Sequence, residues 1–257
     1  MGLGSIVKAV DNMKSPKTFE ELFMEDYRES LISMQQIQEN PKETYRPSSL
    51  ADGCKRMLYY HRMGLGEPKG MTDTNLIEIC DNGTDRHERI QHTVQNMVGV
   101  EWLDIEKHVE EIRKQGVKTE FIKWNDDKTE ARCKNDDLNI YFQCDGLFSY
   151  RGKTIILEIK TMNSYTYNKA NAPLEKHIRQ ATCYGVGLNV DTILFLYEDR
   201  NFMNKKLFLY ELTQEDKDFI RNKIEIVEKA VEDGIPPKKE LDKCLYCTKK
   251  EFCKNEK

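Results

Sequence analysis

Two strand-like segments joined by a turn signal constrain the fold of this 257-residue chain more than any other part of it. The run Thr154–Leu157 is apolar and rich in β-branched residues, as expected of a buried strand. An earlier run over 139–150 has similar character, and Arg151-Gly152 stands between the two. The pattern predicts a β-hairpin within a larger sheet.

Charged side chains gather at one end of this predicted hairpin. Glu158 and Lys160 are two residues apart, so on a strand they share one face, while Ile159 points to the other. Pairing of the two strands brings Asp145 beside Glu158. Two carboxylates and an ammonium group at one point suit a divalent metal ion that activates water. The alternative is a solvated edge strand on which Glu158 and Lys160 form an incidental salt bridge.

Composition places few limits on what the chain binds. The net charge is −4, so any contact with nucleic acid would depend on local basic patches. No apolar run approaches the roughly 20 residues that span a bilayer, and the first residues lack the apolar core of a signal peptide. We therefore expect a cytoplasmic protein with no membrane partner.

Eight cysteines without a secretory signal argue against a disulfide framework. Four lie in strand- or helix-like segments, where we predict small buried side chains: Cys80, Cys133, Cys144 and Cys183. The last three have the spacing C-x2-C-x5-C: Cys244, Cys247 and Cys253. Three thiolates at this spacing can converge on one metal centre.

A fourth ligand for this centre is expected from elsewhere in the chain. Cys54 is the best candidate, because Lys55 and Arg56 beside it favour the thiolate form. Such a centre would tie the N-terminal quarter of the chain to its C-terminus. The ligand types alone leave structural Zn²⁺ and a [4Fe–4S] cluster both open.

Periodicity over the rest of the chain predicts one α/β domain with a mixed sheet. We predict helices over 17–39, 50–63, 73–98, 173–188 and 214–233. We predict further strands over 102–112, 117–124, 128–133, 192–197 and 206–212. Ser48 and Ser49 are the expected caps of the second helix, and Thr213 of the last. The run Asp81–Gly83 is expected to bend or break the third helix.

Six motifs follow one another along the chain: a cysteine-bearing segment at 48–60, G-x-x-x-H at 83–87, Asp145-Gly146, Glu158-Ile-Lys160, Q-x-x-x-Y at 180–184 and the terminal cysteines. In this order they resemble the iron–sulfur nucleases of the PD-(D/E)xK superfamily. That group includes the nuclease domains of RecB/AddB-type helicase–nucleases and the CRISPR-associated exonuclease, with phage-encoded relatives. The resemblance covers about 48–253, and residues before it have no assignable counterpart.

The resemblance implies a restriction-endonuclease-like α/β core, in which helices flank a central mixed sheet. It implies a single nuclease domain over 48–257, preceded by a helical extension over 1–47. The N- and C-terminal segments would be joined by a [4Fe–4S] cluster, with these ligands: Cys54, Cys244, Cys247 and Cys253. Structural Zn²⁺ remains the alternative occupant.

The resemblance also implies roles for the charged residues of the hairpin. Asp145, Glu158 and Lys160 would be catalytic. Mg²⁺ or Mn²⁺ would be held by His87, Asp145, Glu158 and the backbone carbonyl of Ile159. Lys160 would orient the attacking water or stabilise charge that develops on the phosphate.

Four further residues are expected to contact or position DNA. Gln180 and Tyr184 are four residues apart and so lie on one helical face, where Gln180 would contact the DNA backbone or water at the site. Arg56 and Tyr60 combine a cation and an aromatic ring, a pairing suited to a DNA strand. Packing around the metal centre is the alternative role for Tyr60.

We therefore expect a Mg²⁺- or Mn²⁺-dependent DNA exonuclease that acts on single-stranded DNA or on DNA ends. Recombination, repair or phage DNA processing is the expected setting, in a bacterial, archaeal or phage-infected cell. Two alternatives stay open. One is a trimming subunit that needs a partner protein of a CRISPR-adaptation or recombination complex. The other is a DNA-binding protein with a non-catalytic nuclease fold.

Overall fold

The computed structural model describes residues 17–35, 44–65, 70–125, 128–240, 242, 244, 247 and 249–254. The chain separates into two compact units. The smaller unit comprises 1–39 and 68–82, and the larger unit comprises 40–67 and 83–257. The predicted division into 1–47 and 48–257 stays a prediction. Among the described residues, no helix is both long enough and apolar enough to cross a membrane.

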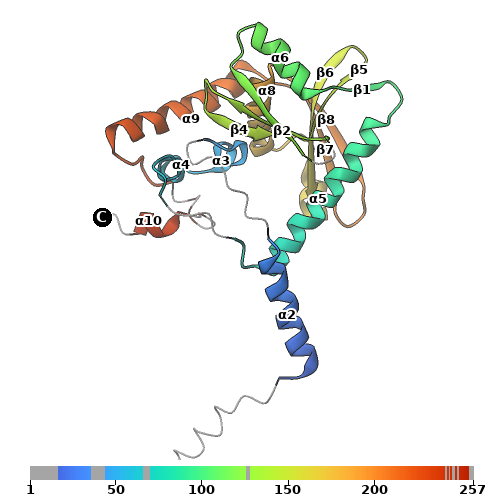
Figure 1. Ribbon diagram of the computed structural model, residues 1–257, viewed down its shortest axis with the longest axis vertical. Coiled ribbons are helices and arrows are strands. Elements are labelled where there is room, and N and C mark those ends of the chain that lie inside the picture. The colour runs from blue at the N-terminus through green and yellow to red at the C-terminus, as the bar shows by residue number, and fades with distance from the viewer. Residues whose placement is uncertain are drawn as a thin grey trace, which may run out of the picture. The chain divides into compact units, whose positions relative to one another are not determined.

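A mixed five-stranded sheet lies at the centre of the larger unit (Figure 1). Its order is β1 (Val100–Trp102), β5 (Gly146–Tyr150), β6 (Lys153–Met162), β7 (Thr192–Asp199) and β8 (Lys205–Glu211). The β6 and β7 strands are parallel, and the other neighbouring pairs are antiparallel. A second, antiparallel sheet contains β2 (Thr119–Trp124), β3 (Ala131–Asn135) and β4 (Ile140–Gln143).

The predicted hairpin is confirmed as strands β5 and β6. Arg151 and Gly152 both have positive φ, at 51° and 78°, which is the backbone that a two-residue type I′ turn requires. The turn fixes the register, in which Gly146 pairs with Leu157. One step further along the same register, Asp145 lies opposite Glu158.

Helices cover the central sheet and pack on one another, so the predicted mixed α/β architecture is confirmed. In the described part of the larger unit, the helices are α3 (Pro47–Asp52), α4 (Lys55–Arg62), α6 (Ile105–Lys114), α7 (Ser164–Lys169), α8 (Glu175–Leu188), α9 (Gln214–Asp233) and α10 (Lys250–Lys254), together with the part of α5 (Thr74–Gln95) from Gly83 onward. Helix α8 contacts β4, β6 and β7, and α9 packs against both α4 and α8 (Figure 1). Helix α9 has the predicted bounds, and Thr213 and Asp216 form its capping box.

Strand β6 is buried on both faces, because apolar groups cover each side of it. Ile155, Leu157 and Ile159 pack in a cluster with Ile90 of helix α5 (Thr74–Gln95). Ile156 belongs instead to the larger core cluster, which also contains residues of α8 and α9. This alternation is the period-two pattern of a central strand.

The predicted helix over 50–63 is wrong as one element. Pro47 begins α3, so Ser48 and Ser49 are helical residues and not caps. Gly53 is extended, with ψ 147°, and it separates α3 from α4. Cys54 is therefore the N-cap residue of α4, at a break between two short helices.

The predicted strand over 102–112 is also wrong, since its greater part is helix α6. The Asp104 side chain caps this helix by accepting a hydrogen bond from the Lys107 amide. The buried residues Ile105, Val109 and Ile112 follow the four- and three-residue steps of a helix. The true helical period was mistaken for alternation over this short stretch.

Three smaller predictions also differ from the structure. The predicted break at Asp81–Gly83 is absent, because α5 continues through it. Cys80 is exposed and not buried. The run over 139–150 forms two strands, β4 and β5, which belong to different sheets. In the smaller unit, the first predicted helix appears as α2 (Phe19–Ser33), while its predicted end at 36–39 lies outside the described residues.

Close packing between α8 and the segments after it predicts a specific stability effect. A Cβ at Gly185 would lie 2.8 Å from the Val190 carbonyl oxygen and 2.2 Å from Leu212 Cδ1. Gly185→Ala should therefore lower the free energy of unfolding by about 1–3 kcal/mol in urea denaturation. The matched control is Gly83→Ala in α5, where the nearest atom would be 3.9 Å away. In that variant the free energy of unfolding should rise by up to about 1 kcal/mol. Equal effects at both positions would contradict the packing.

Candidate active site

The two carboxylates of the hairpin are both held in place by the fold. Glu158 lies within β6 and is 1% exposed. The Asp145 side chain is 13% exposed. The backbone N–H of Ile159 donates to Asp145 Oδ2 at 2.6 Å, which fixes the orientation of this carboxylate across the hairpin. The predicted juxtaposition of Asp145 and Glu158 is thus present in the structure.

Lys160 accompanies Glu158, as its position two residues along β6 requires. The Lys160 Nζ atom lies 2.5 Å from Glu158 Oε1, an ion-pair contact without hydrogen-bond geometry. Glu158 Oε1 is buried and has no hydrogen-bond partner in the described part of the chain. It is a suitable ligand for a cation.

His87 reaches the same point from α5. Its Nδ1 atom lies 3.2 Å from Asp145 Oδ1. Gln180 and Tyr184 approach from α8, and Gln180 Nε2 donates to the Tyr184 hydroxyl at 2.7 Å. Burial raises the pKa of Tyr184 well above its ordinary value, and the charges of Glu158 and Asp145 add to this effect. The Tyr184 hydroxyl is therefore neutral.

The surroundings of the two carboxylates shift their pKa values in opposite directions. Burial raises the pKa of Glu158 to about 7; Lys160 opposes this shift and Asp145 adds to it. Burial acts to raise the pKa of Asp145 too, but His87, Lys160 and the Ile159 amide outweigh it and lower that pKa. Asp145 is consequently anionic at neutral pH, whereas Glu158 ionises fully only if more positive charge arrives.

The structure adds Glu130, which sequence reasoning missed. Ligand atoms of His87, Glu130 and Asp145 all lie within 4.8 Å of one another. Glu130 immediately precedes β3, in the second sheet, and no spacing rule links it to the hairpin. Its only signal in the sequence is that it is a carboxylate within the predicted strand 128–133.

Of the four cysteines predicted to share a metal centre, Cys247 is affected by the charge of the other three. Burial raises the pKa of Cys247, and the neighbouring thiol groups contribute to the same shift: Cys253, Cys54 and Cys244. Helices α4 and α10 lie side by side in Figure 1, and the rings of Tyr60 and Phe252 are 6.0 Å apart. The identity of any metal at these cysteines stays a prediction.

Arg56 and Tyr60 have other partners than those expected at a DNA surface. Arg56 donates to the Tyr60 hydroxyl at 3.0 Å and to the Pro237 carbonyl at 3.1 Å. Tyr60 is 1% exposed. These contacts describe packing between α4 and the segment before the C-terminal cysteines, the alternative that the sequence left open.

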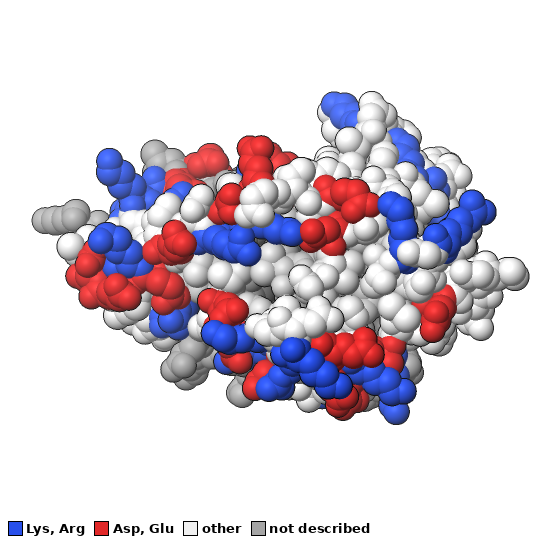
Figure 2. Space-filling view, turned by 90° about the horizontal axis from the view of Figure 1, so that it is seen from above, with Lys and Arg blue, Asp and Glu red and all other residues white. Residues whose placement is uncertain are grey.

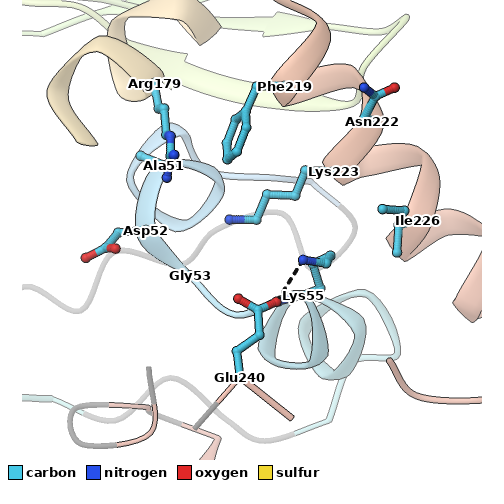
Figure 3. A pocket seen from close by; sticks show the side chains of 10 residues that line it. All are labelled: Ala51, Asp52, Gly53, Lys55, Arg179, Phe219, Asn222, Lys223, Ile226 and Glu240. Carbon is cyan, nitrogen blue, oxygen red and sulfur yellow. Dashed lines mark hydrogen bonds and ion pairs between the residues drawn. The ribbon is translucent and has the colours of Figure 1, made fainter. Parts of the chain in front are cut away.

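A separate pocket of about 300 Å³ lies among α3, α4, α8 and α9 (Figure 3). Lys55, Arg179 and Lys223 project toward it, and Glu240 forms an ion pair with Lys55 at 3.0 Å. The Arg179 guanidinium lies 3.9 Å from the ring centroid of Phe219. The lining does not include the hairpin carboxylates. Elsewhere, on the face in Figure 2, basic and acidic side chains are interspersed.

No family model matches the sequence, and no curated protein matches it. Several solved structures do match. LHK-Exo in complex with dAMP has a TM-score of 0.51 at 15% identity, over 82% of this chain and 93% of that chain. The alkaline exonuclease LHK-Exo from Laribacter hongkongensis has a TM-score of 0.44 at 14% identity, over 80% and 93%. The protein SSO0001 has a TM-score of 0.45 at 14% identity, over 92% and 96%. At such low identity the similarity concerns the fold alone, and the chain shares its mixed α/β fold with LHK-Exo.

Proposed function

We propose that this protein is a divalent-metal-dependent DNA exonuclease of the PD-(D/E)xK type, which acts on single-stranded DNA or on DNA ends. The observation that carries the proposal is the buried Glu158 carboxylate, set opposite Asp145 and paired with Lys160. A merely structural ion pair at this position would not need a second buried carboxylate and an imidazole beside it.

The donor set fits a divalent cation. Asp145 and Glu158 supply carboxylate oxygens, and His87 supplies a nitrogen. Mg²⁺ prefers oxygen ligands, while the imidazole favours Mn²⁺. The backbone carbonyl of Ile159 is proposed as a further ligand. A cation here would also offset the effects of burial and of the Asp145 charge, which otherwise keep the pKa of Glu158 high.

The chain's own residues have distinct tasks in the proposed hydrolysis. A bound divalent cation supplies Lewis-acid polarisation of the scissile phosphate and lowers the pKa of water. Lys160, held by Glu158, directs its ammonium group toward the point where water attacks. Gln180 remains a donor at the rim of the site, and the Tyr184 hydroxyl fixes its orientation. The apolar packing around β6 excludes bulk water from the carboxylates.

The fold similarity supports a nuclease over other metal hydrolases. LHK-Exo is an alkaline exonuclease, and its structure with a TM-score of 0.51 contains dAMP, a deoxynucleotide. We extend that substrate class to this chain because the carboxylates, Lys160 and Gln180 follow the order of the nuclease motifs.

We further propose that the four cysteines hold a [4Fe–4S] cluster, with structural Zn²⁺ as the alternative. The influence of the other three thiol groups on the pKa of Cys247 supports this assignment. The cluster would brace α4 against the C-terminal segment. Contacts independent of it already join these parts, since the Lys55 amide donates to Glu240 and Lys249 Nζ donates to the Leu65 carbonyl.

One observation favours the second candidate function, a trimming subunit that acts with a partner protein. In the smaller unit, α2 has no buried residue, although it carries several large apolar side chains. Those exposed by more than two-fifths are Phe19, Leu22, Phe23, Met24 and Tyr27. Exposed apolar clusters of this kind often contact other proteins.

The nuclease proposal predicts loss of cleavage in Glu158→Gln. The substrates are end-labelled linear and closed circular single-stranded DNA, incubated with anaerobically purified protein and Mn²⁺ or Mg²⁺. Wild type should degrade the linear DNA alone, and the variant should be slower by at least about 10³-fold, because a cation ligand is lost. The control is Glu111→Gln, an exposed position on α6. Equal rates in wild type and Glu158→Gln would exclude the assignment, and cleavage only with an added partner would favour the second candidate.

The raised pKa of Glu158 predicts a pH dependence of stability in EDTA. Unfolding lowers this pKa from about 7 to 4.5, so between these values the folded protein holds more protons. The contribution of Glu158 to the free energy of unfolding therefore falls as pH rises through this window. As pH rises through this window, the free energy of unfolding of Glu158→Gln should increase by about 1–3 kcal/mol relative to that of wild type, as measured by urea denaturation. Excess Mn²⁺ should stabilise wild type and not the variant. Parallel pH curves in EDTA would contradict the account.

The cluster proposal predicts that the metal content depends on Cys247. Anaerobically purified wild type should be brown and contain about four iron and four sulfide per chain. Cys247→Ser should lose the colour and several kcal/mol of stability. Cys80→Ser, at an exposed cysteine of α5, should retain both. Zinc without iron in the purified protein would favour the structural Zn²⁺ alternative over the cluster. Absence of any metal would refute both.

A further inference from the structure

His177 lies on the face of α8 that also carries Gln180 and Tyr184. The three residues follow one another in steps of three and four, so they form one stripe along the helix. Helix α8 contacts β6 and β7, and in the register of these parallel strands Lys160 pairs with Tyr197. The Lys160 and Tyr197 side chains therefore share one face of the sheet. His177 contacts the Tyr197 hydroxyl, so its ring packs between α8 and the sheet face that carries Lys160.

The hydrogen bonds of the Tyr197 hydroxyl determine which ring nitrogen of His177 carries the proton. The Leu174 backbone N–H donates to this hydroxyl at 2.8 Å, and His177 Nδ1 lies 2.7 Å from it. Tyr197 is fully buried, so its single proton needs an acceptor, and Nδ1 is the acceptor that these two partners offer. The hydroxyl therefore donates to Nδ1, and the proton of the neutral imidazole is on Nε2.

The surroundings keep the imidazole neutral. Burial lowers the pKa of His177 to about 3, and the charges of Lys160 and Lys176 act in the same direction. At neutral pH the ring consequently has one occupied acceptor, Nδ1, and one donor, Nε2–H.

This Nε2–H donor has no partner within the described part of the chain. His177 is 8% exposed, and no described residue accepts a hydrogen bond from Nε2. The fully buried unpaired side-chain atoms of the described residues are Gln91 Oε1, Trp102 Nε1 and Glu158 Oε1, and Nε2 is not among them. The donor therefore reaches solvent-accessible space. A structural role is already fulfilled by Nδ1 and does not need this second nitrogen.

The first turn of α8 favours an anion at this donor. His177 is the third residue of the helix, and Leu174 provides no side-chain cap for the first amides. Uncapped amides and the positive end of the helix dipole attract phosphate groups. The acid of this turn, Glu175, forms an ion pair with Arg179.

We propose that His177 is a substrate-binding residue, which donates from Nε2–H to a phosphate of the DNA strand next to the phosphate that is cleaved. The inference rests on the proposed function and deepens it. A protonated Nε2 cannot ligate a cation, so His177 contacts the strand and not the proposed metal ion. Tyr197 is a positioning residue, because it holds the ring in the tautomer that can donate.

Two substitutions in the full-length protein distinguish a DNA contact from a structural role. His177→Asn retains an acceptor for Tyr197 at the place of Nδ1, but has no donor at the place of Nε2. On end-labelled linear single-stranded DNA it should raise KM by about 10- to 100-fold, with kcat within about threefold of wild type. His177→Gln has an amide donor at the place of Nε2 and no acceptor for Tyr197. It should keep KM within about threefold of wild type, but unfold at a lower urea concentration. His92→Asn, at an exposed histidine of α5, should behave as wild type.

The possible outcomes separate this inference from the proposed function. A wild-type KM in a folded His177→Asn, with cleavage intact, would overturn the DNA contact and leave the nuclease proposal standing. Absence of cleavage by wild type would overturn both. If circular dichroism shows that His177→Asn does not fold, nuclear magnetic resonance of wild type labelled with ¹⁵N-histidine decides the matter. The proton should be on Nε2 of His177, and a proton on Nδ1 alone would refute the proposal, because Nε2 could not then donate.

Discussion

The register between β5 and β6 is the constraint on which the site depends. A two-residue turn with both residues in the left-handed region fixes that register, and a slip by one residue would move every side chain of β6 to the opposite face. Glu158 would then exchange places with Ile159 and leave Asp145 without its counterpart. The apolar clusters on both faces of β6 resist such a slip, because it would turn each apolar side chain away from the cluster in which it packs.

That arrangement explains why the carboxylates lower the stability of the folded protein when no cation is bound. Glu158 lies on a strand that is buried on both sides, so its charge gains little from water. Lys160 offsets one negative charge, while Asp145 and Glu130 remain nearby. The ligands are therefore preorganised, and the folded protein is less stable as a result, as expected of functional sites. The fold supplies the scaffold through α8, which packs on β6 and β7, and through α9, which packs on α8.

The sequence predicted those parts whose signals are local. The hairpin, α8 and α9 follow from turn residues, apolar runs and caps, and the motif order located Asp145, Glu158 and Lys160 correctly on the hairpin. Glu130 was missed because it enters from the second sheet, and tertiary pairing has no fixed spacing. Helix α6 was mistaken for a strand because, over a few positions, its apolar residues fit both the helical period and the two-residue alternation of a strand. The rings of Tyr60 and Phe252 lie near each other although the two residues are far apart in sequence, so no local signal predicts this contact.

Binding of a divalent cation by the hairpin carboxylates is what gives this site its proposed chemistry. The most direct measurement is anomalous X-ray scattering from crystals grown with Mn²⁺, collected at the manganese absorption edge. The account predicts an anomalous peak between Asp145 and Glu158, within about 2.0–2.4 Å of an oxygen from each. A map with no peak between these carboxylates at saturating Mn²⁺ would contradict it, and Lys160 would then be their structural counter-ion only.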